Sequence, residues 1–177
     1  MAENFSDELL WKNDWLEARL KDGWYNYIHS ARGGVCILGY RTNGKTELKD
    51  FEFLIRKEHN PAHQGAGLIT TSLTGSIDEG YDPLSTAKKE LMEESGYFAI
   101  MEEFVSHGWV YPLKSTDYKL NLFSINLDGK IPGEIVGDGT LGEKDAGVFW
   151  GDIHAACELR DPHYSTIIAR MLITANK

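Results

Sequence analysis

The segment from 82 to 96 constrains the fold most, because it carries the end signals and one apolar face of a helix. Asp82 can accept hydrogen bonds from the first backbone N–H groups of a helix, and Pro83 suits its first turn. Gly96 stands where a left-handed C-terminal cap is expected. An apolar stripe that can seat the helix on a sheet is formed by Leu84, Ala87 and Leu91. The sequence therefore predicts a helix that runs to about Ser95 and rests on a β-sheet.

Apolar segments that favour β-strands precede and follow this helix in the sequence, and they are expected to form the sheet. Residues 34–40 and 51–56 flank a polar turn and are expected to pair with each other. Further strands are expected at 104–112, 120–127 and 146–152, and helices near 153–159 and from about 163 to 174. This mixture of strands and helices predicts an α/β or α+β fold.

The first 30 residues are interpreted as a separate β-hairpin. Residues 15–20 and 24–30 are rich in strand-forming side chains, and the turn between them contains Gly23, which suits positive φ. We therefore divide the chain into an N-terminal β-hairpin extension at 1–30 and a main domain at 31–177. The length of 177 residues, 42% of them hydrophobic, is enough for one compact domain with a short appended hairpin.

The overall charge argues against nucleic acid and membranes as partners. A formal net charge of −9 repels nucleic acid and anionic lipid at long range. The sequence contains no stretch with the roughly 20 apolar residues of a membrane span, and its first residues do not resemble a signal peptide. We therefore expect a cytoplasmic protein. Cys36 and Cys157 stand far apart and outside any CxxC pattern, which indicates neither a disulfide framework nor a zinc site.

Three glutamates mark the predicted helix as a candidate metal site. Glu90, Glu93 and Glu94 stand at i, i+3 and i+4 and share one helix face. Like charges at this spacing cost about 0.2–0.5 kcal/mol, and anions in the last turn also oppose the helix dipole. A divalent cation reverses the sign of that interaction. The alternative is a solvated acidic face, partly neutralised by Lys88 and Lys89.

The surrounding residues resemble a known family motif. From 75 to 97 the chain reads GSIDEGYDPLSTAKKELMEESGY, which resembles the Nudix box, G-x5-E-x7-R-E-U-x-E-E-x-G-U, where U is a bulky apolar residue. The positions in register are Gly75, Glu90, Leu91, Glu93, Glu94, Gly96 and Tyr97. The resemblance implies a Nudix-like α/β/α sandwich with a mixed central sheet, and the activity of a metal-dependent hydrolase.

Two positions depart from the box. Tyr81 replaces its first glutamate and Lys89 replaces its arginine, so the ion pair that these positions commonly form in the family cannot form here. A contact between Lys89 and Tyr81, or an ion pair from Asp82 or Glu79 to Lys89, can substitute for it. The departures keep open a domain that binds nucleotides without catalysis.

The resemblance assigns roles to the carboxylates. Glu90 and Glu94 are the leading ligands of Mg²⁺ or Mn²⁺, and Glu93 is a further ligand or the catalytic base. The backbone carbonyl of Thr74 is another expected ligand. Many relatives add an acidic residue from a late loop, and here Glu143 is the candidate that activates water. Asp145 is the second choice for that role.

Weaker signals concern the substrate and the oligomer. Pro112 lies about fifteen residues beyond the box, as a proline commonly does in Nudix enzymes that act on ADP-ribose and similar compounds. Trp24 and Tyr25 are candidates for stacking on a base, and Arg56 for contacting a phosphate. The N-terminal hairpin also resembles the one through which such enzymes form dimers, so a homodimer is expected.

These observations predict hydrolysis of the diphosphate linkage in a small nucleoside diphosphate derivative, such as ADP-ribose or a sugar nucleotide. One alternative is a nucleoside triphosphate pyrophosphohydrolase, and another is a non-catalytic Nudix-like nucleotide-binding module. A calcium-binding loop is a poor alternative, because the acidic residues before Glu90 lack the order of ligands that such a loop needs.

Overall fold

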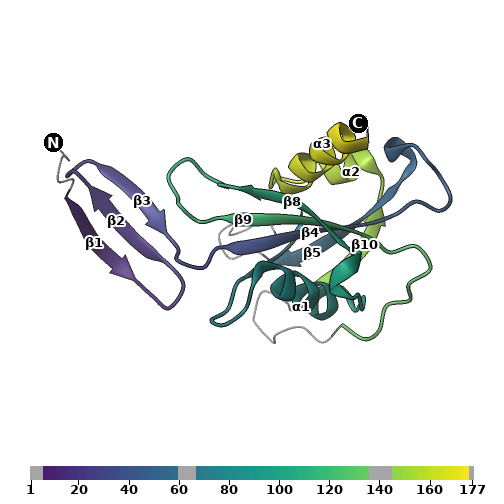
Figure 1. Cartoon of the computed structure of the whole chain (residues 1–177), viewed down its shortest axis with the longest axis horizontal. Helices are drawn as coiled ribbons and strands as arrows, with labels where there is room; N and C mark the ends of the chain where they lie inside the picture. The colour runs from purple at the N-terminus through teal and green to yellow at the C-terminus, as the bar shows by residue number, and fades with distance from the viewer. Residues whose placement is uncertain (1–5, 60–66, 136–144, 176–177) are drawn as a thin grey trace.

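A mixed β-sheet lies between helices in the computed structural model, which describes residues 6–59, 67–135 and 145–175 (Figure 1). The strands are β1 (Asp7–Lys12), β2 (Glu17–Lys21), β3 (Tyr25–His29), β4 (Gly34–Arg41), β5 (Glu52–His59), β6 (Leu68–Thr71), β7 (Leu73–Ser76), β8 (Phe104–Val110), β9 (Leu120–Asn126) and β10 (Gly147–Gly151). The helices are α1 (Pro83–Ser95), α2 (Ile153–Cys157) and α3 (His163–Ala175), with short 3-10 turns η1 (Leu48–Asp50) and η3 (Met101–Glu103). Within the described residues, none of the helices is long and apolar enough to cross a membrane.

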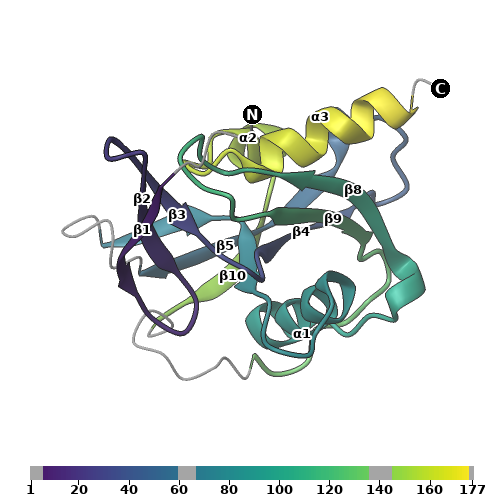
Figure 2. The ribbon, with the colours of Figure 1, turned by 60° about the vertical axis from the view of Figure 1, so that its left-hand side comes forward.

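The central sheet is mixed and has helices on both faces. Its main order is β10-β5-β4-β9-β8, with β4 parallel to β9 and antiparallel to β5. Helix α1 covers one face, and α2 and α3 cover the other (Figures 1 and 2). The α/β sandwich with a mixed central sheet is therefore confirmed.

The chain from β6 to β7 forms a wedge between two strands of this sheet. β4 and β5 pair only where Tyr40 and Arg41 lie opposite Phe53 and Glu52, and then they diverge. Beyond this point β6 pairs with β5 and β7 pairs with β4. Ser72 lies at the break between β6 and β7. The wedge carries Gly75 to the face of the sheet on which α1 lies.

Asp161, just before α3, and Tyr164, in its first turn, hold the wedge from the other face of the sheet. The buried hydroxyl of Tyr164 accepts a hydrogen bond from Leu73 N (3.3 Å) and lies within donating distance of the carbonyls of Ile37 (2.9 Å) and Leu54 (2.8 Å). The Asp161 carboxylate accepts hydrogen bonds from the backbone N–H and the hydroxyl of Ser72. One phenol therefore satisfies backbone groups of β4, β5 and β7 where these strands separate.

Helix α1 has the ends that the sequence predicts. The Asp82 side chain accepts hydrogen bonds from the backbone N–H groups of Leu84 and Ser85, and Pro83 occupies the first turn. Gly96 ends the helix in the left-handed conformation, with φ of 73°. The predicted apolar stripe lies against the sheet, where Ala87 and Leu91 are fully buried.

Most predicted elements are confirmed, and three strands were missed. The expected pairing of β4 with β5 and the later strands and helices are present. No strand was predicted at β6 or β7, because each has only four residues and polar side chains interrupt them. The predicted N-terminal hairpin is present as β2 and β3, and a third strand that was not predicted, β1, pairs with β2.

The three-stranded sheet projects from the main domain and contacts the loop between β8 and β9 (Figure 1). Ile28 N donates to Ser115 O, and Ile28 O accepts from Asp117 N. The Nδ1 atom of His29 lies 2.5 Å from the Asp117 carboxylate.

The expected homodimer through this sheet stays a prediction. If the dimer forms, light scattering would give a mass twice the 19.9 kDa of one chain. A mass of one chain across the micromolar range would contradict it.

We predict that Tyr164→Phe lowers the free energy of unfolding by about 1–3 kcal/mol, because the three backbone groups lose their shared partner in a buried position. Urea denaturation measures the difference. Tyr111→Phe is the matched control, since Tyr111 is 49% exposed and its change should be close to zero. Equal stability of the two variants would show that the Tyr164 hydroxyl does not secure the wedge.

Candidate active site

The three glutamates of α1 share one helix face but differ in how far they are buried. Glu90, Glu93 and Glu94 lie on one continuous helix, so their i, i+3 and i+4 spacing places them on one face as predicted. Glu94 is buried, and Glu90 and Glu93 are half-buried. The carboxylates are therefore held by packing near the last turn of the helix.

Glu90 lies directly against the backbone of β7. A Cβ atom added to Gly75 would lie 2.2 Å from Cδ of Glu90 and 2.4 Å from Cγ. Any side chain at position 75 would displace the carboxyl group, which explains the glycine there. Thr74, whose carbonyl the sequence predicts as a ligand, precedes Gly75 and lies opposite Cys36 in the β4–β7 ladder.

Tyr118 belongs to this cluster, although the sequence did not predict it there. Its hydroxyl occupies the space next to Gly34, where an added Cβ would lie 1.7 Å from the phenol oxygen and 2.8 Å from Gly75 O. Burial raises the pKa of Tyr118, although its hydrogen bond with Ser76 lowers it in part. The negative charge of Glu90 raises this pKa further. The phenol therefore stays neutral beside Glu90. No local pattern in the sequence signals this contact, because it depends on the pairing of β9 with β4.

Arg56 is a buried arginine between the sheet and α1 that pairs with two glutamates. Its side chain is 4% exposed, with Nε 2.6 Å from Glu58 and Nη1 3.1 Å from Glu94. The guanidinium thus joins β5 to α1 inside the protein. Arg56 was expected to contact a phosphate, but in the structure its guanidinium lies against two carboxylates. In this arrangement Arg56 fixes the position of Glu94.

Lys89 forms an ion pair with another residue in place of the glutamate–arginine pair of the Nudix box, which positions 81 and 89 cannot form. Its Nζ lies 3.3 Å from Asp78 and 3.7 Å from Glu93, and 6.0 Å from the centre of the Tyr81 ring. The anticipated contact between Lys89 and Tyr81 is present. The acidic partner is Asp78, and not Glu79 or Asp82 as expected. Asp78 lies in the loop before α1, so Lys89 still ties this loop to the helix.

The remaining predicted residues lie elsewhere. Glu143 is outside the described residues, and Asp145 is an exposed residue just before β10. Pro112 is half-buried in the loop between β8 and β9. Trp24 is 74% exposed in the β2–β3 turn, at the end of the three-stranded sheet remote from α1 (Figure 1). The hydroxyl of Tyr25 donates to Lys114 O, so Tyr25 contacts the β8–β9 loop.

The sequence matches no protein-family model, and it matches no curated protein at a significant level. The assignment of this site therefore depends on the spacing of the box and on the geometry around α1.

The oxygen ligands of the site are of the type that hard divalent cations bind. Carboxylate and carbonyl oxygens are the ligands that Mg²⁺ and Mn²⁺ prefer, and the glycine at 75 leaves Glu90 room beside the backbone. Among the residues that the structure describes, however, no three acidic, histidine or cysteine side chains are arranged to hold a metal ion together. Glu94 turns to Arg56, and Glu93 lies close to Lys89. Binding a cation here requires these carboxylates to rotate toward a common point.

We predict that Arg56→Met lowers the free energy of unfolding by about 3–5 kcal/mol, because it leaves two carboxylates in a buried cluster without this partner. Arg19→Met is the matched control. Arg19 makes the same two kinds of ion pair, 2.6 Å to Glu17 and 3.2 Å to Asp7, but its side chain is 26% exposed. We expect its loss to cost about 0–1 kcal/mol in urea denaturation. Similar costs for the two variants would contradict a structural role for burial at Arg56.

Proposed function

We propose that this protein is a divalent-metal-dependent hydrolase of the Nudix type, which cleaves the diphosphate linkage of a nucleoside diphosphate derivative. The observation that carries the proposal is the contact between Gly75 and Glu90. It brings the first glycine of the box against the glutamate fifteen residues later, on the helix face that also carries Glu93 and Glu94. The capped helix and the loop before it support the resemblance to the box.

The residues that would hold the cation are Glu90, Glu94 and the carbonyl of Thr74. Bound Mg²⁺ or Mn²⁺ supplies positive charge against the phosphate oxygens and makes water easier to deprotonate. Glu93 is half-buried on the same helix face and is the proposed acceptor of the water proton. Arg56 keeps Glu94 in place, and Lys89 keeps the loop that precedes α1 against the helix.

The proposed reaction is the attack of one water molecule on one phosphorus of the diphosphate. The new P–O bond forms as the bridging P–O bond breaks, and the bridging oxygen leaves on the second phosphate. A substrate such as ADP-ribose would give two monophosphates. A nucleoside triphosphate pyrophosphohydrolase would instead release pyrophosphate, so the products distinguish these two activities.

A specific observation also favours a second candidate, a domain that binds nucleotides without hydrolysing them. In the described part of the chain, the acidic side chains are not arranged around a common metal position. Lys89 also brings a positive charge to within 3.7 Å of Glu93. A site held in this way by internal ion pairs would bind a ligand but would not turn it over at any metal concentration.

We predict metal-dependent turnover in a screen with Mg²⁺ and Mn²⁺ against ADP-ribose, sugar nucleotides, dinucleoside polyphosphates and nucleoside triphosphates, with products identified by mass. Glu90→Gln should lower kcat/KM at least about 100-fold, because residues that only support metal ligands already cost 10–100-fold. Glu47→Gln is the matched control, since Glu47 is an exposed residue paired with Lys49 away from α1. Wild-type turnover by Glu90→Gln would exclude the metal assignment. Absence of turnover with retained ligand binding would support the second candidate.

A further inference from the structure

Segment 115–119, which leads into β9, is hydrogen-bonded to the chain that joins the three-stranded sheet to β4. Near its start, Asp117 N donates to Ile28 O (3.1 Å). At its end, Lys119 O accepts a hydrogen bond from Gly34 N (2.9 Å). The two chains therefore run side by side from the last residues of β3 to the first residue of β4.

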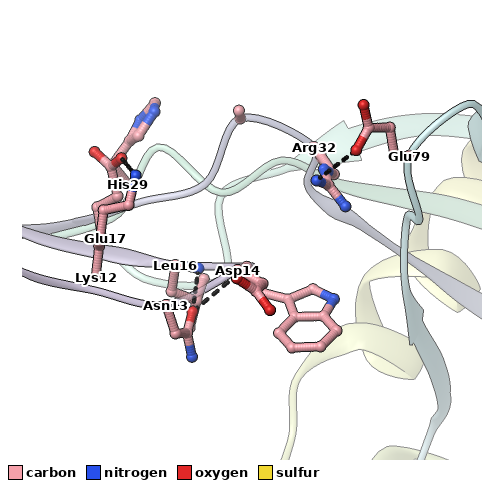
Figure 3. Close-up of a pocket in the computed structure, with 10 residues that line it drawn as sticks. Lys12, Asn13, Asp14, Leu16, Glu17, His29, Arg32 and Glu79 are labelled. Carbon is pink, nitrogen blue, oxygen red and sulfur yellow. Dashed lines mark hydrogen bonds and ion pairs between the residues drawn. The ribbon is translucent and has the colours of Figure 1, made fainter.

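The Asp117 side chain attaches this segment to the three-stranded sheet. Its carboxylate accepts a hydrogen bond from Ser30 N (2.9 Å) and lies 2.5 Å from Nδ1 of His29. Figure 3 shows His29 on the sheet and, further along the connecting chain, Arg32 paired with Glu79 of the loop before α1. The sheet is thus joined to segment 115–119 by a side chain as well as by the backbone.

Tyr118, the residue after Asp117, reaches the place where β4 and β7 begin and end their pairing. Gly34 lies opposite Ser76 in that ladder. The phenol oxygen of Tyr118 fills the space at the missing side chain of Gly34, and the carbonyl oxygen of Gly75 borders the same space. The hydroxyl also hydrogen-bonds with Ser76. Tyr118 therefore holds the end of β7, the strand that carries the carbonyl of Thr74.

Glu90 meets the same short strand from α1. Its carboxyl group fills the space at the missing side chain of Gly75. Burial is the main cause of the raised pKa of Tyr118, and the charge of Glu90 adds to it, so the two groups lie near enough to interact. A strand of four residues that includes a glycine has few side chains of its own to hold its carbonyl groups in place. The carboxyl group and the phenol supply that packing at neighbouring positions of β7.

From these contacts we infer that Tyr118 is a positioning residue for the cation site, whose hydroxyl holds β7 so that the Thr74 carbonyl and the Glu90 carboxylate meet one cation. This inference rests on the metal site of the proposed function. Tyr118 acts through β7 and not by contact with the substrate. Because Asp117 fixes the segment that carries Tyr118, the attachment of the three-stranded sheet contributes to the affinity for the cation.

The test measures binding of Mn²⁺ to the full chain without substrate, with electron paramagnetic resonance to quantify free Mn²⁺. Tyr118→Phe keeps the ring and removes the hydroxyl. It should raise the dissociation constant for Mn²⁺ about 10-fold, because losing a group that orients a metal ligand typically costs 10–100-fold in affinity. A ring that only fills space would leave the dissociation constant of Tyr118→Phe unchanged, and this result would overturn the inference.

Tyr40→Phe is the matched control for the hydroxyl. Tyr40 is also a half-buried phenol on the chain of β4, but it lies near the opposite end of that strand and stacks on Phe51. Its loss of a hydroxyl should leave Mn²⁺ binding unchanged. Equal effects of Tyr40→Phe and Tyr118→Phe would overturn the inference. Urea denaturation checks that each variant is folded.

A second variant tests the attachment while it keeps the phenol. Asp117→Ala removes the contacts with His29 and Ser30 and should also weaken Mn²⁺ binding, but by less than Tyr118→Phe does. Asp128→Ala is its control, because the Asp128 carboxylate accepts hydrogen bonds from backbone N–H groups in the turn at the far end of β4. A larger effect of Asp128→Ala than of Asp117→Ala would contradict the role of the attachment.

Turnover distinguishes a positioning role from a chemical one. In Tyr118→Phe the Mn²⁺ concentration that gives half the maximal rate should rise, and saturating Mn²⁺ should restore kcat. A kcat that stays low at saturating Mn²⁺ would show that the hydroxyl takes part in the reaction, and it would overturn the positioning role.

Glu90→Gln separates this inference from the proposed function. Loss of Mn²⁺ binding in Glu90→Gln, with wild-type binding in Tyr118→Phe, would overturn the inference and leave the hydrolase proposal standing. Weaker Mn²⁺ binding in Tyr118→Phe without any turnover of substrate by the wild type would support the inference and contradict the hydrolase proposal. Wild-type Mn²⁺ binding in Glu90→Gln would exclude both.

Discussion

The site depends on the burial of Arg56 beneath the last turn of α1. An anionic helix end is unstable on its own, because its charges repel one another and oppose the helix dipole. Arg56 lies on β5 and reaches Glu58 and Glu94 from within the sheet, where water screens the interaction little. Helix α1 is thereby tied to the sheet by charge as well as by the apolar contacts of Ala87 and Leu91. Glu90 and Glu93 lie on the same helix, so the Arg56–Glu94 ion pair also holds the backbone that carries them close to the sheet.

The parts of the fold that were predicted are those that local sequence determines. Asp82, Pro83 and Gly96 specify the two ends of α1 within single turns, and the longer apolar runs specify their strands. The missed features depend on residues far apart in the chain. β7 is recognisable only when it is paired with β4, and Ser72 gains its partner from Asp161, 89 residues away. Fold class was therefore accessible from the sequence, whereas the wedge was not.

At the candidate site, the same division holds between what local sequence determines and what distant residues determine. The spacing of Glu90, Glu93 and Glu94 follows from the helix, so their shared face was predictable. The partners of these residues come from other elements: Arg56 from β5, and the phenol of Tyr118 from the segment before β9. Asp78 took the role of partner to Lys89 because the loop before α1 turns back on the helix, which residue types alone do not specify.

The break at Ser72 makes the number of residues in the wedge as important as their identity. Side chains alternate between the faces of a strand, so one residue added between β6 and β7 would turn all of β7 over. Gly75 would then point away from α1, and a bulkier neighbour would meet Glu90 in its place. Natural variation in chain length is thus expected at the surface turn around Asn43 and Gly44, where both residues have positive φ and added atoms at Gly44 would meet open space. It should be absent between Leu68 and Ser76, where the residue count must stay constant and position 75 must remain glycine.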